Sequence, residues 1–246
     1  MNYFISGQSG FIGTAMTNHL LKKRELVYSI PRGQSIYQLR SLFWFNNPDY
    51  IIHLASYGNH YHQKDFAETV NANILGTYNI LEAARSFGYK LFYNVSTSSV
   101  ILKNQTQYSI TKYCGEQLAG MYKNVINIRP YSVYGPGEAS HRFIPTVIRH
   151  LKSGKSMNLD KNACHDWIYI DDFIEAMLNG STEIGTGIKT KNIEVVSMLE
   201  DISGMKLNYQ PARLREYDNE EWVCPDGVNY KIDLFTGLKK MYDSIK

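Results

Sequence analysis

A glycine-rich loop between a predicted strand and a predicted helix constrains this chain more than any other feature. Residues 3–6 form a short, mostly apolar run, glycines follow at Gly7, Gly10 and Gly13, and apolar residues then recur at helical spacing. Glycines there permit a tight turn and let backbone N–H groups approach a pyrophosphate at the helix N-terminus. The spacing is GxxGxxG rather than GxGxxG, so an ordinary strand-to-helix turn is the alternative. The flanking strand and helix favour dinucleotide binding.

Short apolar runs alternate with helical patterns over the first 130 residues. Strands are predicted at residues 3–6, 26–30, 50–54, 90–95 and 125–128, and helices at 11–20, 69–86 and 108–122. Strands separated by helices require crossover connections, so we expect an α/β fold with a Rossmann-like, doubly wound parallel sheet. From about residue 131 the alternation fades, with helices predicted at 143–153 and 173–178. We therefore expect a nucleotide-binding domain over 1–130 and a small, shortened C-terminal substrate lobe over 131–246, part of which can return to the first domain.

Composition excludes several other classes of protein. The chain has 246 residues, of which 43% are hydrophobic and 20% charged, enough for a packed core. No apolar run approaches the roughly 20 residues that span a bilayer, and the start of the chain shows no signal peptide, so no membrane partner is expected. The net charge of +3 is interspersed rather than gathered in a basic stripe, which argues against nucleic acid. The widely spaced Cys114, Cys164 and Cys224 predict free thiols and a cytoplasmic location.

The residues after the second predicted strand distinguish between two cofactors. A fold that selects NAD usually carries an acidic residue about 20 residues beyond the glycine loop, where it binds the ribose 2′-hydroxyl. Residues 26–40 contain no Asp or Glu, and Arg32 follows the predicted strand instead. An arginine there can pair with a 2′-phosphate. We therefore favour NADP (as NADPH), with NAD as the alternative if Arg32 is only a solvated loop residue.

Tyr108 and Lys112 lie four residues apart in a predicted helix, so their side chains share one helix face. A free tyrosine has a pKa of about 10, and a nearby ammonium group favours the phenolate. The pair can therefore act as a general acid in ketone reduction or as a general base in alcohol oxidation. A hydroxyl at the end of the preceding strand, at Thr97 or a neighbour, can hydrogen-bond the same substrate oxygen. Taken alone, YxxxK is common on solvated helix faces, so its weight depends on the residues around it.

With these residues, the chain resembles the extended short-chain dehydrogenase/reductase family, the group of sugar-nucleotide epimerases, dehydratases and reductases. Five ordered blocks carry the resemblance: GQSGFIG at 7–13, PDYIIHLA at 48–55, NANILGTYNILEAA at 71–84, RPYSVYGPG at 129–137 and DWIYIDD at 166–172. Residues 184–187 form a further, weaker block. The resemblance implies a nicotinamide cofactor and a nucleotide-sugar substrate.

The resemblance also implies roles for particular residues. Tyr108 would be the acid/base, Lys112 would lower its pKa and hold the nicotinamide ribose, and Thr97 would be the catalytic hydroxyl. The implied cofactor-binding residues are Gly7, Gly10, Phe11, Ile12, Gly13, Leu54 and Ala55, with Tyr131 and Val133 beside the nicotinamide. Family members often dimerise through the helix that carries the tyrosine, so a homodimer is implied, with Tyr113 and Met121 on the contact face.

Departures from the family pattern narrow the reaction. Dehydratases of the family carry a carboxylate after the catalytic threonine, whereas Ser98 and Ser99 follow Thr97 here. The short connection before Pro48 resembles that of 4-keto-sugar reductases, which favours NADPH-dependent reduction of a nucleotide-linked 4-keto-6-deoxy sugar. The candidate substrate-binding residues are Ser98, Ser99, His141 and His165, the last standing where the family has arginine. An NAD-dependent sugar-nucleotide 4-epimerase and a catalytically idle NADP-binding regulatory protein are the alternatives.

Several other residues have simpler structural explanations. We interpret His60 and His62 as surface residues rather than metal ligands, and expect no metal. His53, within an apolar strand, is predicted to be a hydrogen-bonded core residue. The pair Asp171 and Asp172 is predicted to be a helix N-cap. The remaining aromatic residues singled out, all predicted to lie in the core, are Phe43, Trp44 and Phe45.

Overall fold

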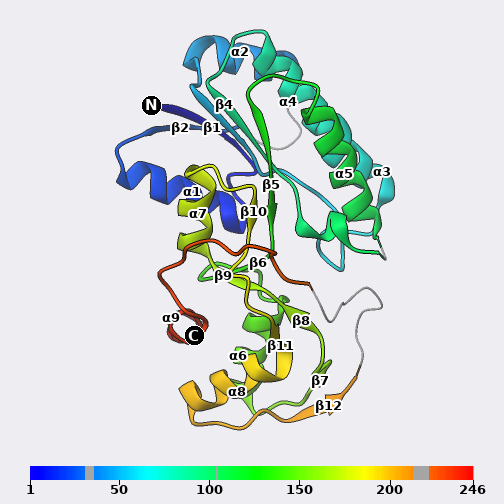
Figure 1. Cartoon of the computed structure of the whole chain (residues 1–246), viewed down its shortest axis with the longest axis vertical. Coiled ribbons are helices and arrows are strands. Elements are labelled where there is room, and N and C mark those ends of the chain that lie inside the picture. The colour runs from blue at the N-terminus through cyan, green and yellow to red at the C-terminus, as the bar shows by residue number, and fades with distance from the viewer. Residues whose placement is uncertain (31–35, 104, 213–221, 246) are drawn as a thin grey trace. The chain divides into compact units, whose positions relative to one another are not determined.

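The computed structural model describes residues 1–30, 36–103, 105–212 and 222–245. The chain divides into two compact units, Met1–Arg129 and Pro130–Lys246. Among the described residues, no helix is both long enough and apolar enough to cross a membrane. Figure 1 shows the elements of each unit.

The first unit is built on a parallel sheet. Its strands lie in the order β2-β1-β3-β4-β5, and every neighbouring pair is parallel. The bounds are β1 (Asn2–Ser6), β2 (Leu26–Tyr28), β3 (Tyr50–His53), β4 (Leu91–Val95) and β5 (Val125–Pro130). The prediction of a Rossmann-like, doubly wound sheet is confirmed. The order reverses between β1 and β3, and such sheets bind ligands outside the carboxyl ends of the strands at this switch point.

Helices cover the sheet and bury its apolar residues. The helix α1 (Phe11–Lys22) follows β1, whereas α2 (Ile36–Asn46), α4 (Gly76–Arg85) and α5 (Gln107–Ala119) pack next to one another (Figure 1). Between them lies a core in which the largest side chains are wholly or almost wholly buried, namely Phe4, Phe43, Ile51, Leu81 and Phe92.

The long helix predicted over residues 69–86 is interrupted. The chain forms α3 (Phe66–Val70), then a π-helical turn η1 (Asn71–Leu75), and only then α4. The side chain of Asn73 in this turn is fully buried and hydrogen-bonded to residues far along the chain. Because periodicity reports only which residues face the core, it does not reveal such a local change of helix type. Turns of this kind are frequent at functional sites.

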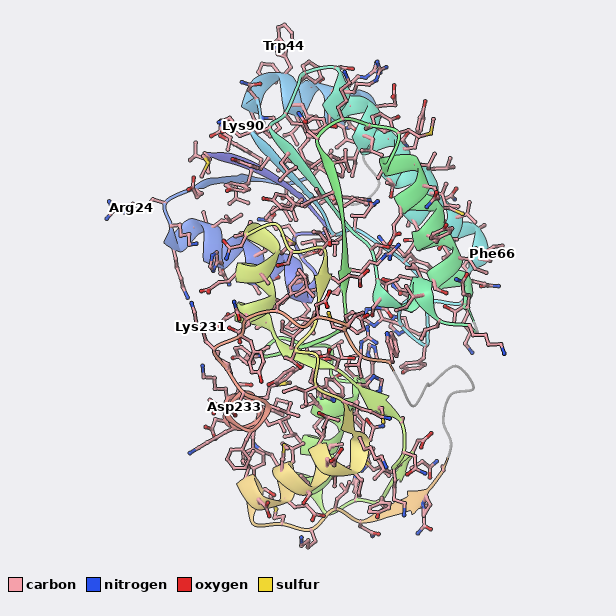
Figure 2. The ribbon with its side chains drawn as sticks, viewed as in Figure 1. Arg24, Trp44, Phe66, Lys90, Lys231 and Asp233 are labelled. Carbon is pink, nitrogen blue, oxygen red and sulfur yellow. The ribbon has the colours of Figure 1, made fainter. Side chains whose placement is uncertain are left out.

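The aromatic run on α2 was predicted to be core, and this prediction is wrong for two of its three residues. Phe43 is 1% exposed, but Trp44 is 72% and Phe45 is 83% exposed. Consecutive residues of a helix point about 100° apart, so only one of the three can face the sheet. Figure 2 shows Trp44 projecting from α2 away from the sheet.

The second unit contains short strand pairs and several helices. Strands β6 and β9 are parallel, β7 and β12 are parallel, and β8 and β11 are antiparallel. The bounds are β6 (Ser132–Tyr134), β7 (Met157–Leu159), β8 (Cys164–His165), β9 (Trp167–Tyr169), β10 (Glu183–Ile184), β11 (Thr190–Lys191), β12 (Tyr209–Pro211), α6 (Phe143–Ser153), α7 (Ile170–Leu178), α8 (Asn192–Ser203) and α9 (Leu234–Ser244).

Buried carboxylates tie the end of the second unit to its centre. The Asp172 carboxylate accepts hydrogen bonds from the backbone N–H groups of Lys231 and Ile232, each at 3.0 Å. The predicted N-cap role of Asp171 and Asp172 is therefore wrong, because Tyr169 occupies the N-cap and both acids lie in the first turn of α7. Tertiary packing decides which distant backbone groups a carboxylate such as that of Asp172 binds, and the local sequence does not reveal this.

Candidate functional site

The glycine loop is a close-packed turn at the carboxyl end of β1. Gly7 has a φ of 73°, a conformation that favours glycine, and the Gly10 N–H donates to the Gly7 carbonyl at 3.0 Å. A Cβ on Gly7 would lie 2.7 Å from the backbone nitrogen of Ala55, and a Cβ on Gly13 would lie 2.2 Å from the Gly7 carbonyl oxygen. The loop therefore requires glycine at positions 7 and 13, and it lies directly against the chain that follows β3.

The N-terminus of α1 opens from this loop without a capping side chain. Gly10 is the N-cap residue, it makes no side-chain hydrogen bond, and the first turn contains no acidic residue. Phe11 and Ile12, the next two cofactor candidates, are half-buried. The first backbone N–H groups of a helix suit an anion when no side chain caps them. The loop, the helix N-terminus and the residues Leu54 and Ala55 therefore form a cradle at the switch point of the sheet.

The helix α5 carries the tyrosine and lysine candidates. Thr106 starts the helix with a capping box, in which its hydroxyl accepts from the Ser109 N–H at 3.2 Å and the Ser109 hydroxyl accepts from the Thr106 N–H at 2.8 Å. Tyr108 and Lys112 are separated by one helical turn and so share a face of α5. Tyr108 is half-buried.

Lys112 is a buried lysine whose ammonium group forms no hydrogen bond or ion pair with the residues that the structure describes. It is 3% exposed. Burial lowers the pKa of Lys112 to about 8, and the opposing charge of Glu116 offsets only part of this effect. Glu116 itself is paired with Arg129 at 2.7 Å. A buried ammonium without a partner is costly, and such groups gather at functional sites because a ligand or reacting group can supply the missing partner.

The hydroxyl candidates lie where β4 ends. The Thr97 hydroxyl accepts from the Ser99 N–H at 3.2 Å and lies 3.0 Å from the Ser99 hydroxyl, so it caps the short helix η2 (Ser98–Ile101). Thr97 and Ser99 are half-buried, whereas Ser98 is 1% exposed. The helix η2 packs against α5. The structure thus brings Thr97 to the carboxyl edge of the sheet, close in the fold to the helix of Tyr108 and Lys112.

A buried histidine joins the glycine loop to α4. The Nδ1 atom of His53 lies 2.6 Å from the Ser6 hydroxyl, and its Nε2 atom lies 3.0 Å from the Thr77 hydroxyl. The Ser6 hydroxyl also accepts from the Ala55 N–H at 3.2 Å. Burial lowers the pKa of His53 to about 3, and the charge of Lys112 adds to this effect, so the ring is neutral at ordinary pH. The prediction of a satisfied core histidine is confirmed.

Asn73 and Thr111 extend this set of buried polar groups, and sequence reasoning did not single them out. The Asn73 side chain donates to the Thr111 hydroxyl at 2.9 Å and to the Tyr57 carbonyl at 2.8 Å. The Thr111 hydroxyl in turn donates to the carbonyls of Gln107 and Tyr108. Asn73 and Thr77 lie in the sequence block at 71–84, which carries the resemblance to the family. A sequence motif, however, does not indicate which residues its polar side chains bind.

The remaining candidates belong to the second unit. Tyr131 is 7% exposed and its N–H donates to the Ile184 carbonyl at 2.9 Å, while Val133 lies in β6. His165 is 5% exposed, with its Nδ1 atom 3.3 Å from the Ser132 hydroxyl. Its ring lies among aromatic side chains, with ring centroids 5.0 Å from Trp167 and 5.7 Å from Trp222.

His141 and Arg32 are the last two candidates. His141 is half-buried, in a turn just before α6. Arg32, on which the preference for NADP rests, lies outside the described residues. Within the described residues, no group of three or more His, Cys, Asp or Glu side chains could hold a metal ion. His60 and His62 stack on each other, with ring centroids 5.5 Å apart.

Comparison with known proteins gives a consistent group of relatives. The profile of the NAD dependent epimerase/dehydratase family matches residues 3–193. GDP-6-deoxy-D-mannose reductase of Pseudomonas aeruginosa is 26% identical over 257 residues, covering 86% of this chain and 84% of that protein. The structure of UDP-glucose 4-epimerase of Thermus thermophilus in complex with NAD is similar, with a TM-score of 0.84, 19% identity and coverage of 100% of this chain and 99% of the other. RMD from Pseudomonas aeruginosa, complexed with NADPH, gives a TM-score of 0.82 at 21% identity, covering 99% and 98%.

Proposed function

The chain belongs to the NAD dependent epimerase/dehydratase family, and from this premise we propose that it is an NADPH-dependent reductase of a nucleotide-linked 4-keto-6-deoxy sugar. Its relatives are sugar-nucleotide epimerases, dehydratases and reductases of the extended short-chain dehydrogenase/reductase type. The similarity to GDP-6-deoxy-D-mannose reductase supports reduction. The serines after Thr97 also support it, because they leave that strand end without the carboxylate that dehydration uses.

The observation that carries this proposal is the burial of Lys112, to which the described residues offer no hydrogen bond or ion pair. Burying a lysine to 3% exposure costs free energy unless its ammonium group gains a partner. Tyr108 lies one turn away on the same face of α5, and its phenolate is one such partner. The hydroxyls of a cofactor ribose are another, since each can accept a hydrogen bond from an ammonium group.

Each of these residues would have a separate role in the reduction of the carbonyl group. NADPH, when bound, supplies the hydride. Tyr108 donates the proton that the carbonyl oxygen gains as it becomes a hydroxyl, and the positive charge of Lys112 stabilises the phenolate that remains. With a pKa of about 8, Lys112 is mostly protonated at pH 7 and can play this part. The Thr97 hydroxyl donates a hydrogen bond to the same substrate oxygen.

The cradle at the switch point fits the pyrophosphate of a dinucleotide. Positions 7 and 13 have no space for a Cβ, and the N-terminus of α1 has no side-chain cap, so a phosphate can approach the backbone N–H groups of residues 11–13. We assign this role to Gly7, Gly10, Phe11, Ile12 and Gly13. Leu54 and Ala55 would border the same cofactor, with Tyr131 and Val133 beside its nicotinamide, and Arg32 would bind the 2′-phosphate.

Substitution of Tyr108 and Lys112 tests the mechanism. Tyr108→Phe should lower kcat by at least about 1000-fold and leave NADPH binding within about twofold, because only the proton donor is lost. Lys112→Met should lower kcat by at least about 100-fold and also weaken NADPH binding. Turnover of keto-sugar nucleotides would be followed by NADPH absorbance, and binding by nicotinamide fluorescence. Unchanged turnover in Tyr108→Phe would disprove the mechanism.

A sugar-nucleotide 4-epimerase that uses NAD is the second candidate, because the Thermus thermophilus structure with a TM-score of 0.84 is such an enzyme in complex with NAD. Titration with NADPH and NADH separates the two. Tighter binding of NADPH that is lost in Arg32→Ala supports the reductase, whereas NAD retained through purification supports the epimerase. Binding of neither would favour a catalytically idle protein.

The remaining assignments follow from the same proposal. We propose that residues 1–130 bind the cofactor and residues 131–246 the sugar nucleotide, with Ser98, Ser99, His141 and His165 as substrate contacts. Cys114, Cys164 and Cys224 form no disulfide bond, which supports a cytoplasmic location. A homodimer is supported by exposed apolar side chains of the first unit. They lie on neighbouring helices, except for Met121 in the turn after α5: Phe66 48%, Leu75 50%, Tyr78 44%, Ile110 47%, Tyr113 43% and Met121 82%.

A further inference from the structure

We propose that a continuous chain of buried hydrogen bonds, running from Ser6 through His53, Thr77 and Asn73 to Thr111, positions the helix of Tyr108 relative to the glycine loop. The inference rests on the proposed function, since it assigns a purpose to residues that touch neither substrate nor cofactor. We call this set the positioning chain. Its members are 3% exposed or less: Ser6 3%, His53 1%, Thr77 1%, Asn73 0% and Thr111 1%.

The hydrogen bonds allow one consistent direction of donation. The Thr77 hydroxyl donates to the Asn73 carbonyl at 2.8 Å, so it can only accept from the Nε2 atom of His53. That atom therefore carries the hydrogen of the neutral ring, and Nδ1 accepts from the Ser6 hydroxyl. The Ser6 oxygen remains able to accept the Ala55 N–H. The low dielectric of the interior strengthens such a fully paired network.

The two ends of the positioning chain contact the two halves of the proposed site. At one end, Ser6 immediately precedes Gly7, and Ala55 lies against Gly7 so closely that a Cβ there would be 2.7 Å from the Ala55 nitrogen. At the other end, Thr111 donates to the Tyr108 carbonyl at 3.0 Å and immediately precedes Lys112. Displacement of one end would therefore shift hydrogen bonds that reach the other.

The packing between the ends leaves little freedom. A Cβ on Gly115 of α5 would lie 2.9 Å from the Asn73 carbonyl and 3.4 Å from the Thr77 hydroxyl, so α5 approaches η1 and α4 at backbone distance. The side chain of Asn73 also fixes both backbone groups of Tyr57, at 3.0 and 2.8 Å. Because misplacing catalytic groups by about 1 Å can cost about 100-fold in rate, this close fit bears on the position of Tyr108.

The test compares two buried threonines that each lose a hydroxyl. Thr77→Val removes a central member of the positioning chain. Thr69→Val removes a hydroxyl that is also buried, 2% exposed, but whose one hydrogen bond among the described residues is donated to the carbonyl of Asp65, the N-cap of α3. We expect Thr77→Val to lower kcat by at least about tenfold with KM values within about threefold, and Thr69→Val to keep the wild-type kcat. Thr77→Ser, which restores the hydroxyl, should recover most of the rate.

Two further measurements keep the outcome decisive. If Thr77→Val does not fold, Thr111→Val with Thr111→Ser repeats the comparison at the other end of the chain. Hydrogen exchange needs no substrate, and Thr77→Val should speed exchange both at residues 55–57 and at 107–112, whereas Thr69→Val should not. A wild-type kcat in Thr77→Val, or an equal loss in Thr69→Val, would overturn the positioning role while leaving the proposed reaction intact. If the wild type reduces no keto-sugar, the proposed function fails and exchange alone decides the positioning role.

Discussion

The two edges of the parallel sheet in the first unit differ in how deeply their polar side chains are buried. At the carboxyl edge, the positioning chain and Lys112 are buried. At the amino edge, exposed basic side chains pair with half-buried carboxylates, as in Lys90 with Asp49 at 2.9 Å and Arg85 with Glu82 at 2.9 Å. Trp44 and Phe45 also stand exposed at the end of α2, directly before β3. Figure 2 shows Lys90 and Trp44 at the surface of this unit.

This difference predicts where substitutions should affect stability and activity. A buried polar group costs free energy unless its partners are kept, so the carboxyl edge depends on particular atoms. An exposed ion pair is screened by water and salt, and its loss changes little. Substitutions at the carboxyl edge should therefore affect both stability and activity, and those at the amino edge neither. Three predictions test this contrast.

The largest effect is expected from Gly13→Ala. The new Cβ would lie 2.2 Å from the Gly7 carbonyl oxygen and 2.8 Å from the Gln8 backbone, so the loop must move. We expect a loss of about 2–3 kcal/mol in the free energy of unfolding and at least about tenfold weaker NADPH binding. Gly120→Ala is the matched control, because its Cβ would meet the nearest atoms at 3.5 Å. Denaturant unfolding and NADPH titration check both, and equal effects would contradict the prediction.

A medium effect on the free energy of unfolding is expected when the pH is lowered. In the folded chain burial lowers the pKa of His53 to about 3, whereas the unfolded value is near 6.5. Between these values the unfolded state binds more protons, so stability falls as the pH falls below 6.5. From pH 6.5 to 5 this amounts to about 2 kcal/mol.

The variant His53→Gln is less stable at pH 7 but should lose this part of the pH dependence. His62→Gln, which replaces an exposed histidine, should keep the wild-type slope. Denaturant unfolding at several pH values measures both slopes. The same slope in wild type and His53→Gln would mean that His53 is protonated in the folded state.

The smallest effect is expected at the amino edge. Asp49→Asn removes the partner of Lys90, whose side chain is 62% exposed against 28% for Asp49. The pKa of Asp49 is lowered mainly by the hydrogen bond from the Asn2 N–H and next by the hydrogen bond from Lys90. Water nevertheless screens the attraction between Asp49 and Lys90, because the pair is partly exposed. We expect Tm to change by no more than about 2 °C and kcat to stay at the wild-type value. A larger loss in thermal unfolding would show that this edge also depends on particular contacts.

Much of the first unit could be predicted from periodicity, and the reason is physical. Alternation of short apolar runs with helical patterns reports burial, and burial is what orders β1, β3, β4 and β5 in a doubly wound sheet. The helix α2 was not predicted, because its apolar run Phe43, Trp44 and Phe45 was interpreted as core without a helical period. In the second unit, α8 and α9 were also not predicted.

For the candidate site, the local sequence predicts only the arrangement of residues that are close in the chain. The glycine loop, the spacing of Tyr108 and Lys112 and the hydroxyl at Thr97 each lie within a few residues, so their arrangement follows from one turn or one helix. The tertiary structure alone decided which polar residues pair across distance. It showed that Lys112 is buried with no partner among the described residues and that His53 joins Ser6 to Thr77. Burial and hydrogen bonding between separate elements depend on how those elements pack.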